Sequence, residues 1–120
     1  MSGNAKFRFF LAPIAVAIFI NGCAGSNTKG YSNSQVRSYN SAVEKLKAGI
    51  RFKNNGQYDK AMENYQHALP LFRKLAREDE DAQIFQEAIS NTHTRIGRTY
   101  DLLGQYDKAM ENFLQALAIG

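Results

Sequence analysis

The chain has 120 residues, 44% of them hydrophobic and only two of them proline, so it has room for one small ordered domain and not for a second. Its formal net charge is +4, partly carried by Lys6 and Arg8 near the start, and this charge does not indicate a nucleic-acid partner. One cysteine excludes an intrachain disulfide, and together with two separated histidines it does not make a metal-site spacing. We therefore expect neither metal nor cofactor.

Residues 1–22 have the pattern of a secretory signal peptide. MSGNAKFR carries two positive charges, and the apolar run FFLAPIAVAIFI follows it. A bilayer-spanning helix needs about 20 apolar residues, so this run is too short for a permanent transmembrane helix. The sequence therefore predicts a signal that is cleaved.

The end of this run resembles the lipobox of bacterial lipoproteins. It reads Ile20-Asn21-Gly22-Cys23, although Asn21 stands where Ala, Ser or Thr is usual. The resemblance implies cleavage between Gly22 and Cys23, a diacylglycerol on the cysteine sulfur and an acyl chain such as palmitate on the new amino terminus. Each buried methylene contributes ~0.8 kcal/mol, so several chains anchor durably. The alternative is an ordinary secreted protein that is cut nearby.

The residue after the cysteine is Ala24 rather than Asp, which in lipoproteins of Gram-negative bacteria favours the outer membrane, facing the periplasm. Residues 23–34 then consist of the lipidated cysteine and AGSNTKGYSNS, which is poor in apolar residues. Such a composition predicts a flexible tether with a reach of ~18 Å. We expect it to hold a folded domain of residues 35–120 close to the membrane.

The nine letters GQYDKAMEN occur twice, beginning at Gly56 and at Gly104, 48 residues apart. Upstream at the same offset, Gly49 matches Gly97. An internal period of this size predicts stacked helical hairpins.

The two copies resemble the tetratricopeptide repeat, with its pattern Trp-x2-Leu-Gly-x2-Tyr, then Ala-x3-Phe. The matching positions are Lys45, Ala48, Gly49, Phe52, Ala61 and Tyr65 in the first copy, and His93, Ile96, Gly97, Tyr100, Ala109 and Phe113 in the second. The aromatic residue that opens the pattern is missing from both. The resemblance implies an all-α fold, in which two antiparallel helix-turn-helix hairpins (about 42–76 and 81–120) form a short right-handed α-solenoid.

The repeated letters have structural explanations. Gly56 and Gly104 suit a left-handed residue that closes a helix, and an Asp in the next first turn suits the helix dipole. Around them we expect small residues that let helices approach and aromatic residues that fill the remaining space: Ala61, Ala68, Ala109 and Ala116, and Tyr58, Tyr65, Tyr106 and Phe113. The nine letters thus predict a turn and a packing contact rather than a catalytic site.

The repeats are longer than the 34 residues usual for the family, and they resemble those of kinesin light chains and of bacterial multi-repeat proteins. The additional residues correspond to about four helical turns, which predicts lengthened helices. We expect Pro70 to bend its helix rather than end it, with Arg77–Asp81 as the next turn. The alternative is that Pro70 starts a separate helix.

In this family the first helix of each hairpin lines a groove for a peptide or a partner's helix. The corresponding residues are Val43, Leu46, Lys47, Ile50 and Lys53, and Thr94, Arg95, Arg98, Asp101 and Leu102. The basic side chains of Lys47, Lys53, Arg95 and Arg98 suit an acidic segment, unless they are simply solvated charges.

Taken together, the sequence favours a membrane-anchored, non-enzymatic adaptor of the bacterial envelope that binds a protein partner. Apolar residues near the end, among them Leu117 and Ile119, also predict self-association through the second hairpin. The alternative function is the first part of a longer multi-repeat protein with an enzymatic domain downstream, such as a caspase-like protease.

Overall fold

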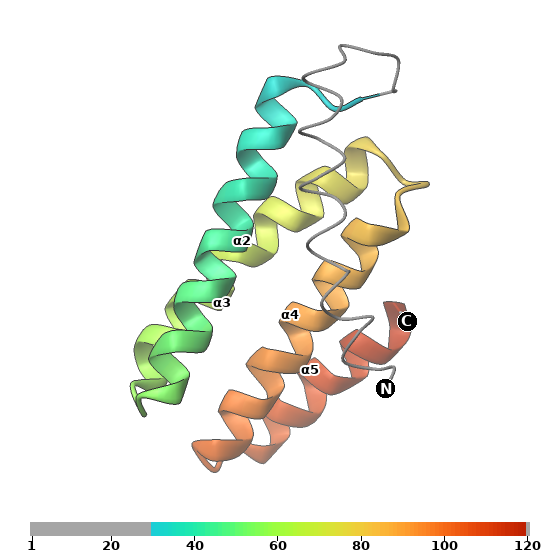
Figure 1. Ribbon diagram of the computed structural model, residues 1–120. Coiled ribbons are helices and arrows are strands. Elements are labelled where there is room, and N and C mark those ends of the chain that lie inside the picture. Colours follow the sequence, from blue (N-terminus) through green and yellow to red (C-terminus); the bar gives the residue numbers. More distant parts are fainter. Residues whose placement is uncertain (1–29, 120) are drawn as a thin grey trace, which may run out of the picture. The chain divides into compact units, whose positions relative to one another are not determined.

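The computed structural model describes residues 30–119, which form four α-helices (Figure 1). Their bounds are Asn33–Asn54 for α2, Tyr58–Glu78 for α3, Gln83–Leu102 for α4 and Tyr106–Ile119 for α5. This part of the chain contains no strand, so the expected all-α class is confirmed. None of its helices is both long and apolar enough to cross a bilayer. The predicted signal peptide, the predicted lipidation site Cys23 and most of the predicted tether lie outside the described residues.

The chain divides into two units, residues 1–37 and 38–120, and each is considered by itself. In the first unit, Ser32 caps the start of α2. The Ser32 N–H donates to Gln35 Oε1 at 2.9 Å, and the Gln35 N–H donates to Ser32 Oγ at 3.1 Å. This reciprocal pair is a capping box, which satisfies two amide groups that a helix start leaves free. Because of this cap, α2 begins within the segment 23–34 that was expected to be a tether.

In the second unit the helices pair as antiparallel neighbours, α2 with α3 and α4 with α5 (Figure 1). α3 also packs against α4, which joins the two hairpins. α3 runs unbroken through Pro70, so the alternative of a separate helix starting there is wrong. Beyond the proline, Phe72 and Leu75 stay on the buried face. The lengthened helix therefore keeps one continuous packing surface.

Each hairpin turns at a glycine in the left-handed region, Gly56 with φ 79° and Gly104 with φ 80°. In both turns the N–H of the next residue donates to the carbonyl five positions earlier, at 2.8 Å in the first turn and 2.9 Å in the second. A residue without a Cβ adopts this conformation at little energetic cost. The two copies of the repeated letters therefore fold into the same turn.

Replacing either turn glycine by alanine is expected to lower the free energy of unfolding by about 1–2 kcal/mol, because the left-handed region strains a residue with a Cβ. A Cβ on Gly56 or Gly104 would meet no atom within 4 Å, so conformational strain is the whole effect. Urea unfolding of Gly56→Ala and Gly104→Ala measures it. Gly56→Asn, which tolerates this conformation better, is the matched control and loses less. Unchanged stability in both alanine variants would contradict this explanation.

The two helices of each hairpin meet at a second pair of glycines. A Cβ on Gly49 would lie 2.5 Å from Cε1 of Tyr65, and a Cβ on Gly97 would lie 2.6 Å from Cε1 of Phe113. The carbonyl of the alanine four residues before each aromatic lies 3.2 Å and 3.1 Å from the same positions. The helices therefore approach closely at these points, with an aromatic ring lying over each glycine.

An aromatic cluster joins three helices in the core. The Tyr39 ring of α2 lies with its centroid 6.1 Å from Phe72 of α3 and 6.1 Å from Phe85 of α4. All three side chains are buried. The Tyr39 hydroxyl has no hydrogen-bond partner, and burial raises the pKa of this phenol above its ordinary value. The cluster therefore acts through apolar packing.

Two expectations from the sequence differ from the structure. Tyr106 was expected to fill space between helices but is 67% exposed, whereas its counterpart Tyr58 is half-buried. The reason is that α3 has a helix on either side, while α5 has only α4 among the described helices. Leu46 was expected to face the groove but is 1% exposed and belongs to the core.

Candidate peptide-binding groove

The predicted groove residues are divided between α2 and α4. Lys47 and Arg98 are exposed, while Ile50, Lys53 and Arg95 are half-buried. Arg95 and Arg98 stand three residues apart on α4, so their side chains are neighbours on one helix face, and Arg98 helps to lower the pKa of Arg95. Lys47 and Lys53 lie on the other helix, α2. Arg95 and Arg98 thus form the basic centre of the candidate site.

Arg95 connects the second hairpin to the first. Its guanidinium lies close to the hydroxyl of Tyr65 on α3, which acts against the lowering of the Arg95 pKa. Tyr65 is 1% exposed, and its ring is held against Gly49 of α2. The guanidinium of α4 therefore lies beside a ring of α3 that packs against α2.

The charge of Arg95 is partly removed from water and has no negative partner. Burial lowers the pKa of its guanidinium, Tyr65 opposes this shift, and Arg98 adds to it. Its Nε is buried and makes no hydrogen bond, and no described carboxylate forms an ion pair with Arg95. Burying an unpaired charge is unfavourable, and a guanidinium matches a carboxylate in geometry and charge. The site is therefore suited chemically to receive a carboxylate.

A partly buried polar network surrounds His93, the residue at which the second copy lacks the usual aromatic side chain. His93 is 3% exposed, and its Nε2 lies 3.1 Å from Nη2 of Arg73 on α3. Its Nδ1 lies 2.9 Å from Oδ1 of Asn112 on α5. Because arginine only donates, Nε2 accepts from Arg73 and Nδ1 donates to Asn112. This network was not predicted from the sequence. The one available signal was that His93 stands at the position where the repeat pattern has an aromatic residue.

The lysines of the repeated letters also have structural partners that the sequence did not reveal. Lys60 Nζ lies 5.6 Å from the centroid of the Phe52 ring, and Lys108 Nζ lies 5.6 Å from that of Tyr100. Both are cation–π contacts between the two helices of one hairpin. These lysines therefore stabilise each turn instead of forming a reactive group.

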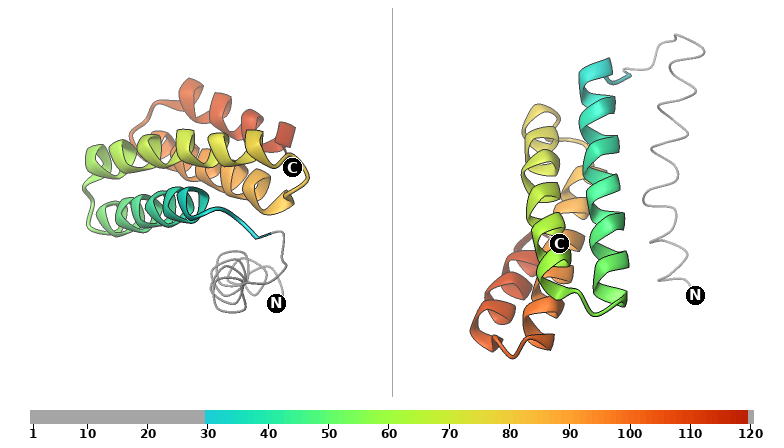
Figure 2. Two further views of the ribbon diagram at one scale, coloured as in Figure 1. Left: turned by 90° about the horizontal axis from the view of Figure 1, so that it is seen from above. Right: turned by 90° about the vertical axis from the view of Figure 1, so that its left-hand side faces the viewer.

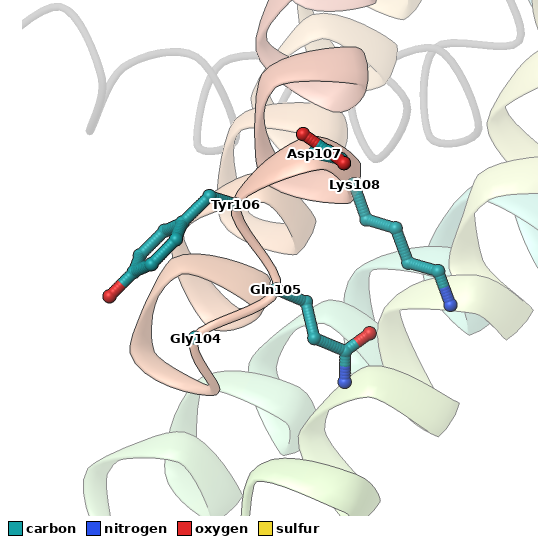
Figure 3. Close-up of a pocket in the computed structure, with 5 residues that line it drawn as sticks. All are labelled: Gly104, Gln105, Tyr106, Asp107 and Lys108. Atoms are coloured by element: carbon teal, nitrogen blue, oxygen red, sulfur yellow. The ribbon is translucent and has the colours of Figure 1, made fainter.

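The second turn contains a shallow hollow lined by Gly104, Gln105, Tyr106, Asp107 and Lys108 (Figure 3). The Tyr106 ring points to one side of the turn, whereas Gln105 and Lys108 point to the other. Asp107 lies in the first turn of α5, where a carboxylate suits the helix dipole. The described residues contain no group of three or more His, Cys, Asp or Glu side chains that could hold a metal ion. We find no arrangement for catalysis in this hollow.

Residues 90–119 match a family model described as Tetratricopeptide repeat. The matched segment begins in α4 and extends to the end of α5, which is the second hairpin. Together with the all-α fold, this match supports a tetratricopeptide repeat protein, and domains of this kind generally bind protein partners. No curated protein matches the chain significantly.

Proposed function

We propose that the protein is a lipid-anchored adaptor of the bacterial cell envelope, whose repeats hold an acidic segment of a protein partner close to the membrane. The observation that supports the binding role is the half-buried Arg95, which has Arg98 beside it and no carboxylate partner. A carboxylate from a partner would neutralise this charge where water is partly excluded. A hydrogen bond to a charged group contributes about 1.5–3 kcal/mol, so one acidic residue accounts for a substantial part of the binding.

Replacing Arg95 and Arg98 together by alanine is expected to weaken partner binding by about tenfold or more, because both positive charges are lost. The protein is purified from host membranes with its partners, which are quantified by mass spectrometry. Arg77→Ala is the matched control, because it removes an exposed arginine from the end of α3 and should leave binding unchanged.

Arg95→Lys separates the charge from the geometry of the site. Lysine keeps the positive charge but loses the planar fork of the guanidinium. We expect intermediate binding for this variant. Unchanged partner recovery from the double alanine variant, with its helical content intact by circular dichroism, would refute the basic centre as the binding site.

The anchor is supported by the sequence pattern of residues 1–23. A charged start and a short apolar run lead directly to Cys23, the only cysteine of the chain. Extraction from host membranes followed by an intact mass measurement tests the anchor. We expect a chain that begins at Cys23 and carries a diacylglycerol with or without a further acyl chain. An unmodified amino terminus would contradict the lipoprotein assignment, and fractionation of the envelope would distinguish the outer membrane from the inner one.

A further inference from the structure

α5 carries an apolar face that no described helix covers. Tyr106, Met110, Leu114 and Leu117 are 67%, 57%, 56% and 73% exposed. Their spacing places them on one side of the helix, so they form a continuous stripe, here called the α5 stripe. α5 is the last layer of the helices, drawn red in Figures 1 and 2. Stripes of this kind on a protein surface mark an interaction site.

In the first repeat, the corresponding face of α3 packs against another helix. Met62 occupies the position in α3 that Met110 occupies in α5, yet Met62 is only 8% exposed and Met110 is 57% exposed. The difference arises because α4 packs beside α3. The same residue type is therefore buried against a neighbouring helix in the first repeat and exposed in the second.

A further repeat stacked as α4 stacks on α3 does not fit the α5 stripe well. Leu114 stands at the position of Gln66, and Gln66 remains exposed although α4 is in place. A helix added in the same way would therefore leave Leu114 in water. The stripe is wider than a stacked repeat would cover.

The surface of α4 that would receive such a repeat is also more polar than its counterpart on α2. Tyr39 and Leu46 of α2 are buried, and Tyr39 contacts Phe85 of α4. At the same offset α4 carries Glu87, which is exposed, and Thr94, which is half-buried. A partner that avoids burying Glu87 lies along α5 rather than across both helices.

The other end of the stack cannot supply this partner. Four residues of α4 that are buried have exposed polar residues at the corresponding positions of α2. The pairs, in order along the chain, are Ala88 with Asn40, Ile89 with Ser41, Thr92 with Glu44 and Thr99 with Arg51. The outer face of α2 is therefore polar, and covering the α5 stripe with it would bury charges without partners. A head-to-tail chain of copies is disfavoured.

We propose that the α5 stripe binds the α5 stripe of a second copy, giving a closed dimer about a two-fold axis. A two-fold contact uses the same patch twice, so an apolar stripe is complementary to itself and the polar ends remain in water. α5 has 14 residues and is ~21 Å long, which is short for an interface that typically buries ~800 Å² per partner. Leu102 and Leu103, which precede the second turn and are 53% and 38% exposed, are further apolar side chains near one end of α5. We expect a dissociation constant in the micromolar range.

The dimer would carry two copies of the basic centre, one in each protomer. A partner with two acidic segments would then bind with higher avidity than to one protomer, because the second contact becomes intramolecular. This consequence depends on the proposed function, whereas the dimer itself does not. Failure of the dimer test and failure of the partner test are thus separate results.

The dimer is tested with the full chain, expressed in its host with two different affinity tags and solubilised in mild detergent. A photoreactive phenylalanine analogue at Leu114 should crosslink two copies, and mass spectrometry should place both ends of the crosslink in α5. The analogue at Asn40, on the polar face of α2, is the control and should give no crosslink between copies.

Variants give a second measurement. Leu114→Gln introduces the residue that the first repeat tolerates at this position, so it should not disturb the fold, and with Leu117→Gln it should reduce recovery of the second tag by about tenfold. Gln115→Ala, an exposed change outside the stripe, should leave recovery unchanged. A crosslink from Leu114 only to another protein, or to α2 of a second copy, would overturn the proposal. So would full recovery of the second tag with the double variant.

Discussion

Replacing Phe72 by alanine is expected to lower the free energy of unfolding by about 3–5 kcal/mol, the largest loss that we predict for a single change. The Phe72 side chain is fully buried, and its ring contacts Tyr39 on the neighbouring helix α2. Removing the ring leaves a cavity between α2 and α3. Domains are typically stable by only 5–15 kcal/mol, so the variant should be close to unfolding at room temperature, which urea denaturation followed by circular dichroism measures.

Leu117→Ala is the control for this prediction. It also truncates a large apolar side chain, but Leu117 is 73% exposed, so its loss should change stability by less than about 0.5 kcal/mol at concentrations where the protein is monomeric. Equal losses in the two variants would mean that the aromatic cluster is not the centre of the core.

Gly49→Ala is expected to destabilise the protein by about 1–3 kcal/mol, although alanine is the better helix former by ~1 kcal/mol. The new methyl group would lie 2.5 Å from the Tyr65 ring, which is 1% exposed, so the ring cannot easily move away. The helices α2 and α3 would have to separate. Thermal unfolding measures this loss.

Gly97→Ala is the matched comparison in the second repeat. The clash with Phe113 is similar in distance, but Phe113 is half-buried, and α5 has no described helix on its other side to hold it. We therefore expect a smaller loss for Gly97→Ala than for Gly49→Ala. If Gly49→Ala instead raised stability, helix propensity would outweigh packing and the proposed close approach would be wrong.

The turns and the packing within each hairpin could be predicted because they depend on residues close in the sequence. Gly56 and Gly104 each stand between two helical patterns, and the repeated letters showed that both turns are alike. The position of Pro70 was harder to interpret, because a proline can bend a helix or start one. The apolar residues Phe72 and Leu75 keep the helical spacing after it and indicated that the helix continues, which the structure confirms.

The contacts between the hairpins could not be predicted from the pattern. The exposure of Tyr106 depends on which helices surround α5, and the repeated letters are the same whether or not a neighbour is present. The contacts of Arg95 with Tyr65 and of His93 with Arg73 join side chains 20 to 30 positions apart, on α4 and α3. Nothing local in the sequence specifies such pairs.

The candidate site was predicted only in part for the same reason. Four basic residues were expected to face one groove, and of these Arg95 and Arg98 lie close together. A sequence pattern places residues on a face of one helix, whereas a site across two helices also depends on how the helices cross. Leu46 was expected in the groove but is part of the core. It lies on the same buried face of α2 as Tyr39 and Ala42.

The most direct test of the adaptor function is a site-specific crosslink made in the host. Asn91 is half-buried and lies one helical turn before Arg95 on α4, so a photoreactive residue there reaches a ligand bound to the basic centre without removing either arginine. We predict capture of a segment rich in Asp or Glu from an envelope protein, and loss of this crosslink when Arg95 is replaced by alanine. No captured protein, or a crosslink that is unaffected by Arg95→Ala, would contradict the account.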